Sequence, residues 1–186
     1  MRKACVLAVL VVILTGCSHS SQELERGLEL RSRLQKAAST SFEAEITADY
    51  GEKIYTFSMS CEGKNNGDLL FTVTKPETIA GITGRFDCEG GALTFDEHAL
   101  HLGLLADGQT TPVAAPWIVY KSILGGYLSC AGMEDGIIRL TIDDSYADDA
   151  LTVDVWLDEN DLPASAQILY KGRSFLSLSI KNFQIL

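Results

Sequence analysis

Few side chains of this sequence are spaced for catalysis. Beyond the first 20 residues only two histidines occur, His98 and His101, and imidazole is the commonest general base in enzymes. Ala-Leu separates them, within or beside a predicted strand, unlike the helical H-E-x-x-H of zinc proteases. Neither serine nor cysteine stands in a G-x-S-x-G elbow. We therefore expect a non-enzymatic protein with no catalytic residues and no cofactor.

Acidic side chains gather toward the C-terminus, where carboxylates could bind Ca²⁺. They form the pairs Asp143-Asp144, Asp148-Asp149 and Asp158-Glu159, with Asp161 close by. The segment 144–148 lacks the D-x-[DN]-x-[DN]-G order of a calcium loop. Aspartate is also a usual turn residue between strands. The pattern favours solvated turns over a metal site.

Three cysteines, Cys61, Cys88 and Cys130, fall inside the predicted domain. They have no C-x-x-C spacing, which disfavours a zinc or dithiol site. A bridge between Cys61 and Cys88 is one interpretation, although a disulfide needs Cα atoms a few Å apart. We favour the other interpretation, in which all three are buried and act as small hydrophobic side chains.

The N-terminus has the organisation of a secretory signal peptide. Arg2-Lys3 precede the uncharged run Ala4–Leu14, which is too short to span a bilayer because a spanning helix needs about 20 residues. Leu14-Thr15-Gly16-Cys17 follows, and this tetrapeptide resembles the bacterial lipoprotein signal, in which the cysteine thiol takes a diacylglyceryl group and becomes the first residue. The alternative is an ordinary secretory signal followed by a chance cysteine. The complete pattern favours lipid attachment at Cys17.

This interpretation divides the chain into a signal peptide (residues 1–16), a lipidated tether (residues 17–21) and one domain (residues 22–186). The signal contains two of the 15 basic and none of the 25 acidic side chains, so the mature chain carries a formal charge of −12. Such a charge argues against nucleic acid as a partner and against electrostatic binding to anionic lipids. We expect acyl chains on Cys17 to hold the protein on the extracytoplasmic side of a bacterial cell membrane.

The periodicity of the domain predicts two helices and about nine strands. A helix is expected over Gln22–Ala38, although Gly27 weakens it. In the strand Leu151–Asp158, Val153 and Val155 are expected to face inward and Thr152 and Asp154 to face solvent. A shift of the apolar phase at Asn182 predicts a bulge. The other strands are expected over 42–50, 55–61, 69–74, 79–88, 93–95, 99–104, 137–142, 164–170 and 176–185.

A short apolar helix is expected over Trp117–Leu124, between Pro116 and Gly125-Gly126. Trp117, Tyr120 and Leu124 share one face of it. The helix could be a lid over a cavity, or it could plug an ordinary core, and the sequence leaves both interpretations open.

The order of these elements resembles the LolA-type lipoprotein-carrier superfamily. Most of the likeness lies in the segment 71–84, with its strand, proline and return strand, and in Gly90–Phe95. The sequence is also similar to the lipid-anchored branch of Gram-positive envelopes, which includes spore germination lipoproteins. The resemblance implies an α+β fold: a strongly curved antiparallel sheet, or incomplete β-barrel, covered by helices.

In that superfamily the concave side of the sheet can take up acyl chains of a lipid or a lipoprotein. The soluble carriers are not lipidated, whereas Cys17 should tether this chain. They also use an arginine inside the barrel to hold the lid, and neither Arg85 nor Arg139 is a safe match. Two functions therefore stay open: binding of acyl chains of a lipid or lipoprotein in an apolar cavity, as the resemblance implies, or docking of an envelope or spore-cortex protein through a filled barrel.

Overall fold

The computed structural model describes residues 19–88, 90–94, 110–147 and 150–186. The predicted lipid site Cys17, the two histidines His98 and His101 and the predicted strand 99–104 lie outside these ranges. Two α-helices, α2 (His19–Lys36) and α3 (Ala115–Gly125), and the short 3-10 helix η1 (Pro112–Ala114) accompany ten strands. The strands are β1 (Ser39–Asp49), β2 (Ile54–Lys64), β3 (Leu69–Lys75), β4 (Thr83–Asp87), β5 (Gly90–Thr94), β6 (Tyr127–Glu134), β7 (Ile137–Asp143), β8 (Thr152–Leu157), β9 (Pro163–Tyr170) and β10 (Arg173–Ile185).

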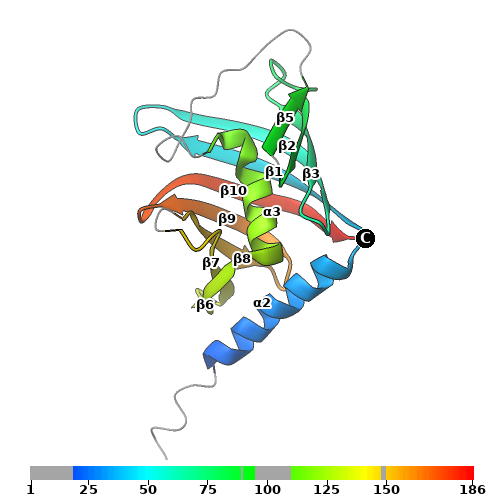
Figure 1. Ribbon diagram of the computed structural model, residues 1–186. Helices are drawn as coiled ribbons and strands as arrows, with labels where there is room; N and C mark the ends of the chain where they lie inside the picture. Colours follow the sequence, from blue (N-terminus) through cyan, green and yellow to red (C-terminus); the bar gives the residue numbers. More distant parts are fainter. Residues whose placement is uncertain (1–18, 89, 95–109, 148–149) are drawn as a thin grey trace, which may run out of the picture.

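All ten strands belong to one curved sheet (Figure 1) with the order β5-β4-β3-β2-β1-β10-β9-β8-β7-β6. Two meanders, β1–β5 and β6–β10, are joined where β1 pairs antiparallel with β10. The described parts of β5 and β6 are the two edges of the sheet. The predicted α+β fold, a curved antiparallel sheet covered by helices, is thus confirmed.

Within the described residues, the expected strands agree with the sheet except in two places. Strand β6 was missed, because the exposure of its side chains does not alternate at an edge of the sheet. The extended segment expected over Ile79–Cys88 is strand only in β4, and turns occupy residues 77–81. The bulge expected at Asn182 is present: its φ is 54°, and the β1–β10 register shifts between Ser41 and Glu43.

One face of the sheet, the inner face, carries the apolar core. Alternate residues of each strand are buried there, as period-two patterning requires; Ile46 of β1, Val155 of β8 and Ile168 of β9 are fully buried. The prediction that Val153 and Val155 face inward is confirmed. The core therefore lies between this face and the helices.

Helix α2 lies across the β6 and β7 end of the sheet (Figure 1). It begins at His19, so its first turn reaches into the segment that we assigned to the tether. Leu30 and Leu34 are buried, whereas Leu24 and Leu28 are exposed. Gly27 has a packing role, because a Cβ atom there would lie 2.9 Å from Cδ2 of Leu140.

The opposite face of the sheet, the outer face, is polar but not uniformly solvated. Asp154 lies on this face, as predicted, yet only 2% of its surface is exposed. The expectation that Asp154 faces solvent is therefore wrong. Its carboxylate accepts hydrogen bonds from Arg139 at 2.6 Å and from Thr141 Oγ1 at 2.7 Å, and these partners cover it.

The three domain cysteines are free thiols, and only Cys61 is buried. The prediction of three buried cysteines is therefore wrong for Cys88 and Cys130. Cys88 lies just after β4, and Cys130 lies on the edge strand β6, where the sheet offers less cover. The bridge between Cys61 and Cys88 is not formed.

Candidate functional site

The helix α3 spans the inner face of the sheet (Figure 1) and contains the predicted segment Trp117–Leu124. Pro116 lies in its first turn, where backbone N–H groups have no partner within the helix, so the missing N–H of proline costs no hydrogen bond. The helix ends where the N–H of Gly126 donates to the carbonyl of Ser122 at 2.8 Å. Most side chains of α3 are buried, since the sheet lies on one side and α2 at its end.

Tyr120 is the best-anchored residue of α3. It is 2% exposed, and its hydroxyl accepts a hydrogen bond from Thr40 Oγ1 at 2.8 Å and donates to the carbonyl of Lys64 at 3.1 Å. The ring packs directly on Gly63, where a Cβ atom would lie 2.5 Å from Cζ of the tyrosine. Burial raises the pKa of Tyr120, and the hydrogen bond from Thr40 partly opposes this shift.

Trp117 lies at the first turn of α3 and is only half-buried. Its indole stacks on Phe86 of β4 with the ring centroids 5.6 Å apart. Its Nε1 donates to the carbonyl of Gly67 at 3.0 Å, and Nζ of Lys121 lies 4.8 Å from the ring centroid. Trp117 thus joins α3 to the β2–β3 turn and to β4.

The C-terminal end of α3 is capped by two side chains of α2. Arg31 donates to the carbonyls of Ile123 at 2.7 Å and Gly126 at 2.8 Å, and Gln35 donates to the carbonyl of Leu124 at 2.8 Å. Free carbonyls at a helix C-terminus favour a cation and donor groups. Partial burial lowers the pKa of Arg31. These contacts hold α3 against the sheet at the end opposite Trp117.

The space between α3 and the inner face is almost completely filled. A cavity between α3 and this face, as bounded by the described residues, has a volume of about 10 Å³ and is lined by apolar side chains, among them Phe42, Val119 and Leu178. Of the predicted lid residues, Tyr120 and Leu124 are buried and Trp117 packs on β4. In this structure α3 therefore plugs the curved sheet.

Two of the acidic residues weighed for Ca²⁺, Asp144 and Asp158, accept hydrogen bonds from backbone N–H groups of their own turns. Asp144 Oδ1 accepts from the N–H of Leu151 at 2.8 Å, and Asp158 Oδ1 accepts from the N–H groups of Asn160 at 2.8 Å and Leu162 at 2.9 Å. In the described ranges no three His, Cys, Asp or Glu side chains are grouped to hold a metal ion. Burial raises the pKa of the Cys61 thiol, which keeps it protonated.

No helix within the described part of the chain is both long enough and apolar enough to cross a membrane.

Comparisons with known proteins gave matches among solved structures. The chain is similar to a LolA superfamily protein from Nitrosomonas europaea, with 10% identity and a TM-score of 0.46, covering 86% of this chain and 93% of that one. It is similar to the lipoprotein LppX of Mycobacterium tuberculosis, with 16% identity and a TM-score of 0.39, covering 87% and 93%. A third match is a chain of the Pseudomonas aeruginosa MucA/MucB complex, with 11% identity and a TM-score of 0.39, covering 85% of this chain and 56% of that one. No protein-family profile and no curated protein matches the sequence.

Three residues that hold α3 were missed by the sequence analysis: Thr40, Arg31 and Gln35. Thr40 is fully buried and donates a hydrogen bond to Tyr120, which lies 80 positions further along the chain, so no local pattern indicates the contact. Arg31 and Gln35 are four residues apart, and i,i+4 spacing on a helix places them on one face. That spacing indicates that the two side chains point the same way, but it does not indicate that they bind the C-terminal end of α3.

Proposed function

We propose that this chain is a bacterial envelope lipoprotein, held at the extracytoplasmic side of the membrane by acyl chains on Cys17, and that its domain is a non-enzymatic interaction module. The observation that carries the second part is the filled space under α3, with about 10 Å³ left. Among the described residues, a space of this size under α3 is too small for an acyl chain, so the outer surface is the part of the domain that can contact partners. Kinship with the lipid-anchored Gram-positive branch is part of this proposal.

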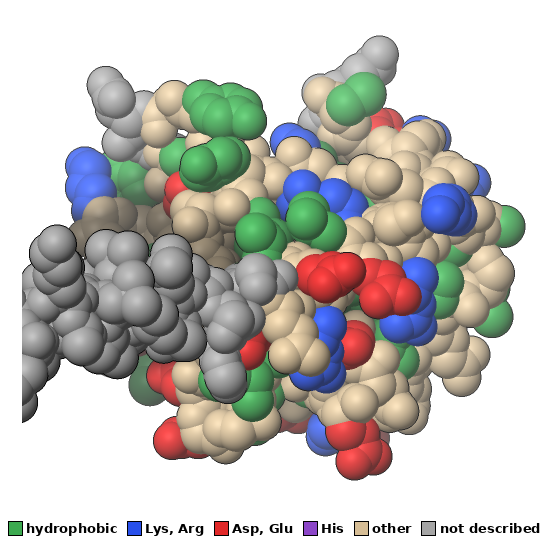
Figure 2. All heavy atoms as spheres, turned by 90° about the horizontal axis from the view of Figure 1, so that it is seen from below, with side chains coloured by type: hydrophobic (Ala, Val, Ile, Leu, Met, Phe, Trp, Pro, Cys, Tyr) green, Lys and Arg blue, Asp and Glu red, His purple; other side chains and the backbone are tan. Residues whose placement is uncertain are grey.

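The charge of the described surface supports lipid anchoring over electrostatic binding. Figure 2 shows acidic and basic side chains interspersed on the face seen from below, with apolar side chains in separate small groups. A formal charge of −12 on the mature chain adds repulsion from anionic headgroups. The attachment then depends on Cys17.

Replacing Cys17 by Ala is expected to move the protein from the membrane fraction to the soluble fraction. The reason is that two acyl chains give stable anchoring, whereas a formal charge of −12 on the mature chain disfavours electrostatic attachment to anionic headgroups. The measurement is membrane fractionation followed by a high-salt wash. The control is Cys130→Ala, which removes an exposed thiol of the domain and should leave the protein in the membrane pellet. A Cys17→Ala protein that stays in the washed pellet would contradict lipid anchoring.

Binding of acyl chains is the second candidate function, and the wall under α3 favours it. Phe42, Ile180 and Phe183 are among the residues that line the small cavity there, and no polar side chain other than Tyr120 is among them. If α3 swung away, this wall would suit an acyl chain, because ligand pockets for apolar groups are lined by such side chains.

A fluorescent fatty acid titrated into the protein carrying Cys17→Ala distinguishes the two functions. We expect no saturable binding, together with a loss of about 2–3 kcal/mol of unfolding free energy for Trp117→Ala, because the stacked and hydrogen-bonded indole is part of the core. Saturable binding that Trp117→Ala weakens, with little loss of stability, would favour a lid over an acyl-chain cavity.

A further inference from the structure

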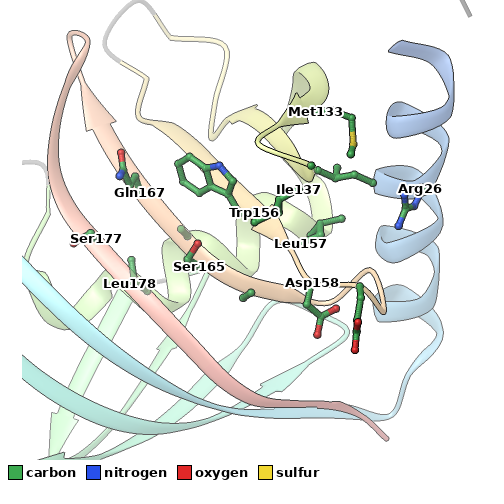
Figure 3. A pocket seen from close by; sticks show the side chains of 15 residues that line it. Arg26, Met133, Ile137, Trp156, Leu157, Asp158, Ser165, Gln167, Ser177 and Leu178 are labelled. Carbon is green, nitrogen blue, oxygen red and sulfur yellow. The ribbon is translucent and has the colours of Figure 1, made fainter. Parts of the chain in front are cut away.

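A groove of about 750 Å³ lies where β8, β9 and β10 turn their outer faces to solvent (Figure 3). Trp156 of β8 stands in the middle, with Gln167 of β9 on one side and Ile137 of β7 on the other. At one end it is bounded by Arg26 of α2 and by the turn after β8. Its volume is that of pockets that bind small organic ligands.

The indole of Trp156 is held in place by its neighbours. Its Nε1 donates to Glu134 Oε2 at 2.8 Å, and the guanidinium of Arg139 lies 5.4 Å from the ring centroid. Arg139 in turn donates to Asp154 at 2.6 Å, and Asp154 is almost completely buried. A buried carboxylate thus orients the arginine, and the arginine and Glu134 orient the ring. The groove contains an aromatic surface that is positioned before any ligand arrives.

Polar side chains beside this ring are available to a ligand. The amide of Gln167 and the hydroxyls of Ser165 and Ser177 line the groove, and none of them makes a hydrogen bond to another residue that the structure describes. The register places these side chains next to one another, because Ser165 pairs with Trp156 and Gln167 with Ser177. Together they offer donors and acceptors without a net charge.

Three kinds of ligand fit this groove poorly. An extended peptide cannot add as a strand, since β8 and β9 are paired on both sides. An acyl chain would leave the amide and hydroxyl groups without partners. An anion would be repelled by Asp158 and Glu159, which line the groove at the end where Arg26 is already paired with Asp161.

We propose that this groove is a binding site for a neutral carbohydrate chain. The apolar face of a sugar ring would stack on Trp156, and its hydroxyl groups would bond to Gln167, Ser165 and Ser177. Ile137, which is 46% exposed, and Met133, which is 52% exposed, form an apolar patch beside Trp156 that suits the methyl group of an N-acetylated amino sugar. The site lies on the face opposite α3 and is independent of the lipid anchor, so it goes beyond the proposed function.

The test uses the detergent-purified protein and tri-N-acetylchitotriose, a neutral oligosaccharide, with maltotriose as a second neutral probe. The chain has two tryptophans, so Trp117→Phe leaves Trp156 as the only one. We expect a saturable change in its emission with a Kd on the order of 1 mM or tighter for at least one probe. Gln167→Ala should weaken that binding by about 5–10-fold, because one hydrogen-bonding group is lost.

The matched control is Gln184→Ala, the same substitution at an exposed position of β10 that does not line the groove. It should leave binding unchanged. Trp156→Leu should abolish binding in saturation-transfer NMR, and a melting curve shows whether the variant is folded. If neither saccharide shifts the Trp156 emission up to about 10 mM, or if Gln184→Ala weakens binding as much as Gln167→Ala, the proposal is wrong. Membrane release by Cys17→Ala is a separate measurement, so the two proposals can fail separately.

Discussion

Replacing Val155 by Asp is expected to unfold the domain. Val155 is fully buried on the inner face, between its cross-strand neighbours Leu140 and Ala166. A carboxylate there would be either charged in an apolar core or protonated without a partner, and both states are costly. We expect a loss of more than about 4 kcal/mol, most of the stability of a typical domain. Urea unfolding followed by circular dichroism measures it.

The control for this change is Thr56→Asp, which places the same carboxylate on an exposed residue of β2. Because water solvates that position, the loss should stay below about 1 kcal/mol. Equal losses for the two variants would mean that β8 does not present Val155 to the core.

The contrast between these positions shows what period-two patterning can predict. Alternation in β8 predicted the facing of Val153, Val155 and Asp154, because successive side chains of a strand point to opposite faces. It could not predict that Asp154 is buried, since the cover comes from Arg139 on the neighbouring strand. Facing is a local property of a strand, whereas burial depends on which strand pairs with it.

The same distinction applies to the sheet as a whole. The strands were predicted where apolar residues alternate. The pairing of β1 with β10 joins residues far apart in the chain, such as Thr40 and Ile185, which are 145 positions apart, and no local pattern indicates it. Strand β6 escaped prediction because an edge strand with few buried side chains has no clear period. The resemblance to the LolA-type superfamily, rather than periodicity, indicated the curved arrangement.

Of the two candidate sites, the helix α3 was predicted from the sequence and the groove at Trp156 was not, because only the first depends on a local pattern. The helix around Trp117 was visible from its proline and glycine boundaries. Whether this helix covers a cavity or fills one depends on the volume between the helix and the sheet, which cannot be calculated from the sequence. The groove at Trp156 was missed, because Ser165, Gln167 and Ser177 look like ordinary outward residues until the register places them beside an indole.

The second large effect is expected for Tyr120→Ala. The tyrosine is buried between α3 and the sheet, and its ring covers the backbone at Gly63. Removing it deletes the largest side chain among those that are almost fully buried and leaves Thr40 without one of its partners. We expect a loss of about 3–5 kcal/mol in unfolding free energy, as for other buried aromatic residues. Urea denaturation monitored by tryptophan fluorescence measures it.

Two further variants show which part of Tyr120 is responsible. Tyr120→Phe keeps the ring and removes only the hydroxyl, so it should cost about 1–2 kcal/mol, since Thr40 can still donate to the carbonyl of Gly63 at 3.3 Å. Tyr146→Ala removes an aromatic side chain that is 90% exposed and should cost less than about 0.5 kcal/mol. If Tyr120→Ala were as mild as Tyr146→Ala, α3 would not be seated on the sheet in solution, and the inner face would be open to an acyl chain. A large loss for Tyr120→Ala with an intermediate loss for Tyr120→Phe would mean that α3 is part of the core, because a helix that opens readily cannot contribute that much to global stability.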